Sequence, residues 1–174
     1  MIQDKVFLTG VERHFDEHDI IVSKTDLKGR ITYANDTFLR VAGYRERDIL
    51  GQPHSIIRHP DMPRCVFSLL WQTIEAGREI FAYVINRCSN GDHYWVLANV
   101  TPTFGPGGKI IGYHSNRRVP RRDALEKVIP LYKTLCEEEA KERNRKEGMA
   151  RGTAMVTSLL TDAGLDYDQF VFTL

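Results

Sequence analysis

The sequence predicts an α+β fold, in which a five-stranded antiparallel sheet has a helical insert on one face and a C-terminal helical extension. Two strand-like segments come first, within residues 19–35, and three more follow within residues 80–118. Between them, residues 35–76 carry helical periodicity. Short turns join the last three strands, so these strands pair most simply as an antiparallel meander. The helical segment then becomes an insert that covers one face of the sheet.

The first predicted elements are a short helix and a hairpin. The segment TGVERHF offers Thr9 as an N-cap, and we assign residues 1–18 to an N-terminal helical cap. An apolar and β-branched run, DIIVSKTD, follows, and the glycine turn LKGR joins it to a second run, ITYAN. This succession of strand, turn and strand opens the main domain, which we place at residues 19–119.

Three helical segments make up the insert. NDTFLRVAGY starts at an N-cap, either Asn35 or Asp36, and ends at Gly43. RERDILGQP is a shorter helical turn. From Pro63 to Ala76 apolar residues recur at helical spacing, and Gly77 ends the pattern. The apolar stripe consists of Val66, Phe67, Leu70, Trp71 and Ile74.

Two turn signals separate the last three strands. IFAYVINRC ends at SNGD, a tight hairpin signal, and GPGG lies between HYWVLANVTPTF and KIIGYHSNR. Side chains of the middle strand alternate between two faces. One face carries Tyr94, Val96, Ala98 and Val100, and the other carries Trp95, Leu97, Asn99 and Thr101.

Beyond Pro120 the chain is densely charged, and we assign residues 120–174 to a charged C-terminal helix and an apolar tail. Pro130 is expected to kink or restart the helix. The mixed charges of EEEAKERNRKE predict a solvated helix face or, alternatively, a surface for a partner. Because an exposed FVFTL end would be a liability, we expect this tail to dock on the sheet or on a second subunit. The candidate apolar stripe of the helix is Leu125, Val128, Ile129, Tyr132 and Leu135.

Composition excludes some classes of function. The net charge of +1 gives no electrostatic argument for binding nucleic acid or a membrane surface. No apolar stretch approaches the roughly 18 residues that a membrane span needs, and the N-terminus lacks a secretory signal, so a cytoplasmic location is expected. The 3 cysteines are scattered, which predicts reduced thiols.

The segment IRHPDMP, at residues 57–63, gathers a cation, an imidazole, a carboxylate and two prolines immediately before an apolar helix. Together with other motifs it identifies a resemblance to PAS domains, and in particular to the sensor domain of bacterial aerotaxis (energy-taxis) receptors. The resemblance runs from about Thr25 to Leu135. The stretches that carry it are NDTFLRVAGY, LGQPHSIIRHPDMP, LLWQTIEAG, NRCSNGDHYWVLANVTP and VIPLYKTL.

The resemblance implies a PAS fold that binds FAD without a covalent bond and reports redox state or oxygen to a chemotaxis or other signalling protein. It also implies a sensor and not an enzyme, and a homodimer is expected. The chain departs from the receptor pattern because it has no membrane span and no long signalling hairpin, and its FVFTL tail has no counterpart.

Several candidate cofactor-binding residues follow from the resemblance. The receptors need an arginine, a histidine and an aspartate that match Arg58, His59 and Asp61. A guanidinium can hold a phosphate bidentately, whereas Asp61 is expected to cap the next helix or to orient its neighbours. Asn35 and Asn86 match receptor asparagines implicated in cofactor binding or signalling.

Chemistry adds three further candidates. Trp71 could stack on a ring of the cofactor, and Asn99 is a weaker candidate from the middle strand. His54, like His59, lies where some PAS domains bind haem, so a haem-binding gas sensor is one alternative. Each residue also has an ordinary structural interpretation, such as a helix cap for Asn35 or a core position for Trp71.

Other functions are weighed against the redox sensor. A cofactor-free interaction module would leave the polar HPDMP cluster unpaired. A LOV photoreceptor would need the NCRFLQ-like motif with its reactive cysteine, which is absent. A metal site at His54, His59 and Asp61 lacks further ligands, and no nucleophile–base pair indicates a flavoenzyme. In the redox sensor, a change in flavin protonation would rearrange hydrogen bonds and alter how the C-terminal segment packs on the sheet.

Overall fold

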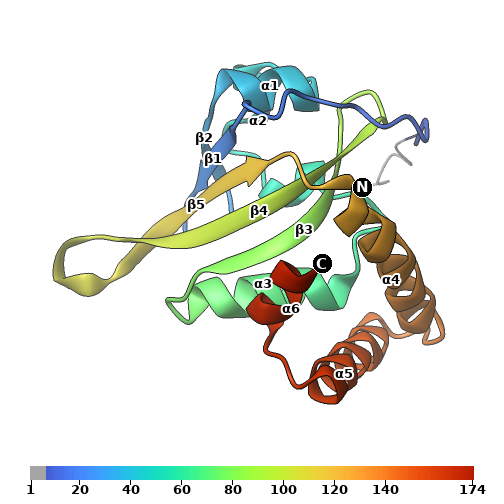
Figure 1. The fold of residues 1–174 in the computed structure, drawn as a ribbon. Helices are drawn as coiled ribbons and strands as arrows, with labels where there is room; N and C mark the ends of the chain where they lie inside the picture. Colours follow the sequence, from blue (N-terminus) through green and yellow to red (C-terminus); the bar gives the residue numbers. More distant parts are fainter. Residues whose placement is uncertain (1–6) are drawn as a thin grey trace.

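A computed structural model describes residues 7–174 and contains one five-stranded sheet with the strand order β2-β1-β5-β4-β3 (Figure 1). All neighbouring strands pair antiparallel, as the sequence predicted. β4 and β5 continue beyond the other strands as a long hairpin, whose tip contains the short helix η2, Pro106–Gly108. The strands are β1 Ile21–Thr25, β2 Ile31–Ala34, β3 Ile80–Arg87, β4 His93–Phe104 and β5 Ile110–Arg118.

The helical insert lies between β2 and β3, and its longest helix runs beneath the sheet (Figure 1). It consists of α1 Asp36–Ala42, α2 Glu46–Ile49, η1 His54–Ile57 and α3 Arg64–Glu75. The predicted ends of α1 are confirmed, because Asn35 accepts a hydrogen bond from the Phe38 amide and Gly43 adopts φ 72°. The 3₁₀ turn η1 was not predicted, since no periodic apolar pattern marks so short an element.

The two faces of the sheet have different neighbours. Because side chains alternate along each strand, Asn86, Ala98 and Ser115 point to the inner face, toward the insert. Phe81 and Trp95 occupy the opposite phase and point to the outer face. The C-terminal helices cover part of this outer face over β3 and β4.

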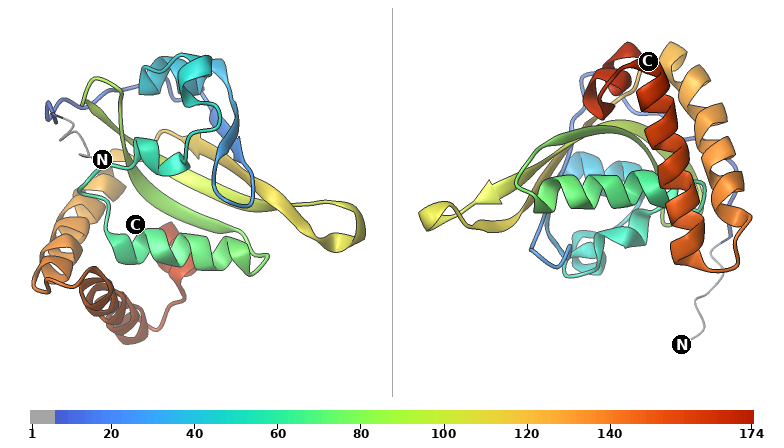
Figure 2. Two further views of the ribbon diagram at one scale, coloured as in Figure 1. Left: turned by 180° about the vertical axis from the view of Figure 1, so that it is seen from behind. Right: turned by 90° about the horizontal axis from the view of Figure 1, so that it is seen from below.

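Three C-terminal helices replace the single charged helix that the sequence predicted. They are α4 Arg122–Ala140, α5 Arg145–Ala163 and α6 Tyr167–Thr173. α5 packs against both α3 and α4 (Figure 2). Asn144 caps α5 and divides the charged region in two. The expectation that Pro130 restarts the helix is wrong: α4 continues through it, and the C=O that loses its N–H partner belongs to the exposed Glu126.

The apolar tail docks on the sheet, which confirms one of the two expectations for it. Helix α6 packs on β3, where the rings of Phe81 and Phe172 lie 4.9 Å apart. Val171 is buried in the same seam. α4 joins this layer through the Tyr132 hydroxyl, which donates to the Tyr83 carbonyl at 2.6 Å. The predicted stripe of α4 is buried apart from Ile129.

The predicted N-terminal helix is wrong where it falls on described residues. Residues 7–16 form no helix and instead run beside the β3–β4 hairpin, with backbone bonds from Thr9 to Gly91 and from Arg13 to His93. The Thr9 hydroxyl, expected as a helix cap, donates to Asp92 at 2.6 Å. Pairing with the hairpin therefore overrides the local helical signal. The rest of the predicted cap, residues 1–6, lies outside the described residues.

One hydrophobic core joins the sheet, the insert and the C-terminal helices. Its buried members include Phe38 of the insert, Val96 of the sheet and Leu135 of α4. Within residues 7–174, no helix is both long and apolar enough to cross a bilayer.

Candidate ligand-binding cavity

A cavity lies between the inner face of the sheet and the insert. Its free space amounts to about 660 Å³ when the part open to solvent is counted. Strands β1, β3, β4 and β5 form its roof, and η1, the following loop and α3 form its floor. Its lining includes Ser23, Thr25, His54, Ile57, Arg58, Met62, Phe67, Leu70, Trp71, Ile74, Asn86, Val100, Tyr113, Ser115 and Arg117.

The polar part of this cavity is centred on Arg117 of β5. This side chain is only 2% exposed, and its Nη2 donates to the Ser23 hydroxyl. Its guanidinium carbon lies 4.8 Å from the centroid of the Phe38 ring, in cation–π geometry. Among residues 7–174, no carboxylate forms an ion pair with Arg117. Burial lowers the pKa of this guanidinium, so its charge is held at a cost.

His54 lies next to the same hydroxyl, with its Nε2 3.3 Å from Ser23 Oγ. Desolvation of the ring, and then the charge of Arg117, lower the pKa of His54 to about 3. The imidazole is therefore neutral at physiological pH. It can exchange hydrogen bonds with a ligand but adds no charge.

Several polar atoms in the cavity have no hydrogen-bond partner within the described part of the chain. They are Nε and Nη1 of Arg117, Nδ2 of Asn86 and Oγ1 of Thr25, and all of them are buried. Leaving a buried donor unpaired costs about 1–3 kcal/mol, so native proteins leave few such groups. Their concentration in one cavity indicates that a polar ligand or water completes the site.

The remainder of the cavity is apolar and aromatic. Trp71 of α3 stands edge-on to Tyr113 of β5, with ring centroids 5.5 Å apart, and contacts Phe67 at 6.4 Å. Trp71 also packs against the turn between β1 and β2: a Cβ atom at Gly29 would lie 2.8 Å from the indole. These contacts fix the indole as one wall of the cavity.

Four of the eight sequence-predicted site residues line the cavity: Arg58, Trp71, Asn86 and His54. Arg58 is half-buried and pairs with Asn86 through an isolated backbone bridge. One of its Nη atoms donates to the Met62 carbonyl at 3.0 Å, and its guanidinium lies 4.9 Å from the Phe67 ring centroid. The other guanidinium nitrogens form no hydrogen bond with described residues, so they could meet an anionic group.

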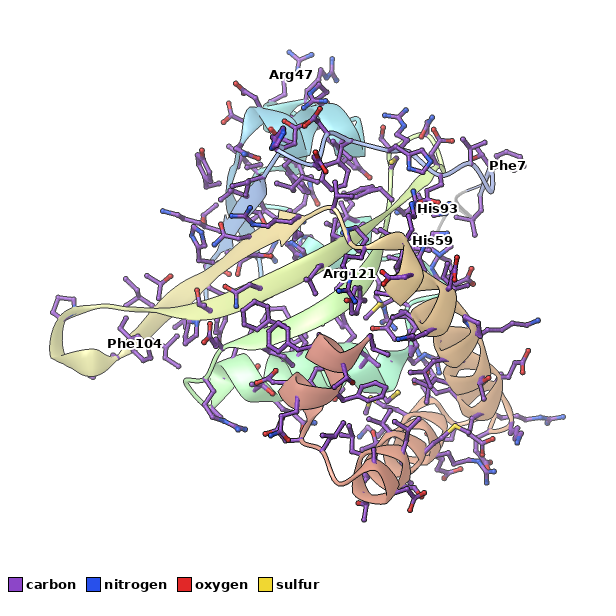
Figure 3. All side chains as sticks on the ribbon, viewed as in Figure 1. Phe7, Arg47, His59, His93, Phe104 and Arg121 are labelled. Atoms are coloured by element: carbon purple, nitrogen blue, oxygen red, sulfur yellow. The ribbon has the colours of Figure 1, made fainter. Side chains whose placement is uncertain are left out.

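His59 and Asp61 lie close together but do not line the cavity. His59 is buried, and its Nδ1 accepts the Asp61 amide at 3.1 Å, which fixes the turn of the HPDMP segment. Its ring lies beside His93 at 5.6 Å, at the end of the sheet near the N-terminal segment (Figure 3). The Asp61 carboxylate points outward, with 78% of its side chain exposed.

Asp61 does not cap α3, contrary to one of the roles expected for it. Glu139 of α4 supplies that cap instead, by accepting hydrogen bonds from the amides of Arg64 and Cys65. Sequence distance hid this contact, because a cap is normally sought within a few residues of the helix start.

The two remaining candidates also lie outside the cavity lining. Asn35 uses its amide locally: Oδ1 accepts the amides of Val22 and Phe38, and Nδ2 donates to the Ile20 carbonyl. Asn99 points to the outer face, where its Nδ2 donates to Glu79 at 3.1 Å. The placement of Asn99 follows from strand alternation, since it has the opposite phase to Ala98 and Val100.

Arg117 and Ser23, the hydroxyl residue to which it donates, were not among the candidates predicted from the sequence. The signal was present in IIGYHSNRR, where alternation puts Tyr113, Ser115 and Arg117 on one face. An arginine near the end of a strand is usually exposed, so alternation alone did not distinguish it from a solvated surface position.

Comparison with known proteins decides the family. Residues 16–115 match the family model described as PAS fold. The chain belongs to the PAS family. The PAS domain is 47% identical over 115 residues, or 66% of this chain, to the aerotaxis receptor of Escherichia coli K12. It is 29% identical over 133 residues, or 76% of the chain, to a nitrogen fixation regulatory protein of Klebsiella pneumoniae. The matched regions span 22% and 26% of these two relatives.

Solved structures agree with the PAS fold. The dark structure of the blue-light photoreceptor aureochrome 1 LOV superposes with a TM-score of 0.56 at 24% identity. That match covers 63% of this chain and 82% of the LOV chain. A similarity at 24% identity shows a shared fold.

The cysteines of this PAS protein, all within residues 7–174, do not line the cavity. Within the same range, no group of three or more residues could hold a metal ion.

Proposed function

We propose that this PAS protein binds FAD and reports redox state or oxygen to a signalling partner. The identity of 47% to an aerotaxis receptor supports the sensory role. The cofactor rests on one observation above all: Arg117 is a buried cation whose free donors line a cavity and lack an acceptor within residues 7–174. A ligand with acceptor atoms along one edge would complete its hydrogen bonds.

The composition of the cavity fits a flavin ring. Such a ring is flat, with an apolar benzenoid end and an opposite end that carries both hydrogen-bond donors and acceptors. The cavity lining likewise contains both kinds of group, with Arg117, Asn86 and His54 among its polar residues and Trp71 and Val100 among its apolar ones.

Each lining residue then has a defined task. Arg117 donates hydrogen bonds and positive charge, Asn86 contributes the free Nδ2, and neutral His54 holds the Ser23 hydroxyl in place. Arg58, a half-buried residue of the cavity lining, is suited to a phosphate. FAD would supply the electron-transfer chemistry, while the protein binds it, orients it and excludes water.

The C-terminal helices are the proposed route of output. β3 carries Asn86 on its inner face and contacts α4 and α6 on its outer face, so a shift of this strand reaches both layers. We propose a homodimer in the cytoplasm that acts on a chemotaxis or other signalling protein, with residues 19–119 as the sensor and residues 120–174 as the output segment.

The first test is the visible absorption spectrum of the purified protein. Bands at about 370 and about 450 nm that bleach with dithionite, together with FAD released on heating, are expected for the flavoprotein. A sharp band at about 410 nm would instead indicate haem, with His54 as the axial ligand to test. Protein that stays colourless after incubation with FAD would contradict the cofactor and leave an interaction module.

Two asparagines on opposite faces of the sheet provide a matched pair. Asn86→Ala removes a cavity donor and should weaken FAD binding about tenfold, the effect of one buried hydrogen bond. Asn99→Ala makes the same chemical change on the outer face and should leave the affinity unchanged. Equal losses in both variants would contradict binding at this cavity.

A further inference from the structure

Helix α3 receives its N-terminal cap from a distant part of the chain. Oε1 of Glu139 accepts the Cys65 amide at 2.8 Å, and Oε2 accepts the Arg64 amide at 3.1 Å. The residue at the N-cap position itself is Pro63, whose side chain makes no capping bond. A carboxylate at a helix N-terminus satisfies two free amides and also interacts favourably with the helix dipole.

The carboxylate of Glu139 is enclosed, and the residue is only 4% exposed. Helix α5 closes over it with two glycines. A Cβ atom at Gly148 would lie 2.2 Å from the Glu139 carbonyl oxygen. A Cβ atom at Gly152 would lie 3.0 Å from both Glu139 Oε1 and Cys65 Sγ. Three helices therefore meet at Glu139, and α5 approaches its backbone at Gly148 and its carboxylate at Gly152.

The helix that Glu139 caps is also a wall of the cavity. Phe67, Leu70 and Trp71 project from α3 into the lining, within two turns of the capped amides. The preceding loop contributes Arg58, which donates to the Met62 carbonyl. Cys136, one turn before Glu139 on α4, donates its thiol to the Asp61 carbonyl at 3.4 Å. α4 thus holds both the first turn of α3 and the loop that leads into it.

Glu139 lies outside residues 16–115, the part that matches the PAS family. We infer that Glu139 is a positioning residue of the ligand cavity: it fixes the start of α3, and through that helix the wall formed by Phe67 and Trp71. Because coupling between two equilibria is reciprocal, occupation of the cavity must then strengthen the contact of α3 with α4 and α5. The first part of this inference, that Glu139 positions α3, does not depend on which ligand the cavity binds. The second part, the response to FAD, rests on the proposed function.

Amide hydrogen exchange of the ligand-free chain tests whether Glu139 positions α3. Glu139→Gln keeps the shape of the side chain but replaces one carboxylate oxygen with an NH₂ group, which cannot accept a hydrogen bond from a backbone amide. Exchange at residues 64–67 and in the loop 58–63 should rise about tenfold or more, with little change in the sheet. Glu137→Gln makes the same change on the exposed side of α4 and should have no effect. Val128→Ala removes buried apolar contacts elsewhere on α4 and should lower global stability without this local pattern.

The second measurement is FAD affinity. Glu139→Gln should weaken binding about tenfold, and Val128→Ala, at matched loss of stability, should not. Should Glu139→Gln fail to fold, Gly152→Ala displaces the carboxylate without removing it and should act in the same direction. Unchanged exchange at residues 58–67, or acceleration spread equally over all helices, would overturn the inference. Failure of the wild type to bind FAD would refute the proposed function and leave the exchange result to decide the role of Glu139.

Discussion

Arg117 is the residue whose environment most needs a ligand. Without one, its charge is buried and two of its nitrogens lack partners within the described chain. Arg117→Met keeps the length of the side chain but removes the charge. We expect the free energy of unfolding of the ligand-free protein to stay level or rise by about 1–2 kcal/mol, because an unpaired buried donor no longer has to be desolvated. FAD binding should fall at least about tenfold in the same variant.

Denaturant unfolding of the ligand-free protein and an FAD titration measure the two effects. Ser68→Ala is a control for substitution in the insert, since the hydroxyl of this half-buried residue of α3 accepts a hydrogen bond from Gln72 of the same helix. A clear loss of ligand-free stability in Arg117→Met would mean that Arg117 is already satisfied, and would remove the main support for a ligand at this end of the cavity.

At this scale, alternation in β4 correctly predicted which face each side chain occupies, but not which face holds the cavity. Asn86 lines the cavity, and Asn99 does not, although both seemed suitable on amide chemistry alone. The roles of Glu139 and Arg117 depend on contacts with residues more than 70 positions away, at Arg64 and Ser23. Local patterns carry no information about such contacts.

At the scale of elements, the sequence predicted every strand and the three α-helices of the insert, because each has either a period or a clear turn signal. It failed at the N-terminal segment. There the carboxylate of Asp92, in the β3–β4 hairpin, accepts hydrogen bonds from the Thr9 hydroxyl at 2.6 Å and from the Arg13 guanidinium at 3.0 Å. A Cβ atom at Gly91 would lie 2.0 Å from the Phe7 carbonyl oxygen, so the segment crosses the hairpin where only glycine fits.

The attachment of this segment should depend on pH. Hydrogen bonds from Thr9, Asn90 and Arg13 lower the pKa of Asp92 from the ordinary 3.8 to about 2. Because the pKa of Asp92 is lower in the folded than in the unfolded state, its ionised carboxylate stabilises the folded protein at pH values above its unfolded-state pKa. This stabilisation is lost as the pH falls toward its folded-state pKa. Between about pH 4 and pH 2, unfolding midpoints of the wild type should therefore fall more steeply than those of Asp92→Asn.

Urea unfolding at several pH values measures this difference, and hydrogen exchange of residues 9–13 shows whether the segment is released. Asp162→Asn, on the exposed face of α5, is the matched control, since its carboxylate lies 3.5 Å from a single hydroxyl. Parallel curves for the wild type and Asp92→Asn would show that Asp92 does not hold the N-terminal segment.

At the scale of the whole molecule, the sheet is shared by two layers. The insert and the cavity occupy its inner face. On the outer face, α6 packs on β3, and Tyr132 of α4 contacts β3 and the ring of Trp95 on β4. Several hydrogen bonds link α4 to the sheet and the insert. Tyr132 donates to the carbonyl of Tyr83 on β3, Glu139 accepts two amides of the first turn of α3, and Cys136 donates to the loop before α3. Because the hydrophobic core is continuous through both layers, they should unfold together.

The protein's two tryptophans report on these layers separately. Trp71 lies in the cavity wall, and Trp95 lies on the outer face with its ring centroid 5.9 Å from that of Tyr132. In the single-tryptophan variants Trp95→Phe and Trp71→Phe, fluorescence in urea should follow the far-UV circular dichroism of the same variant, with one midpoint for both probes. If Trp95 fluorescence changes at lower urea than the circular dichroism, the C-terminal layer separates first. That outcome would mean that the outer layer unfolds as an independent unit. Ligand binding in the cavity could then alter the outer layer only through local unfolding, and not through the shared core.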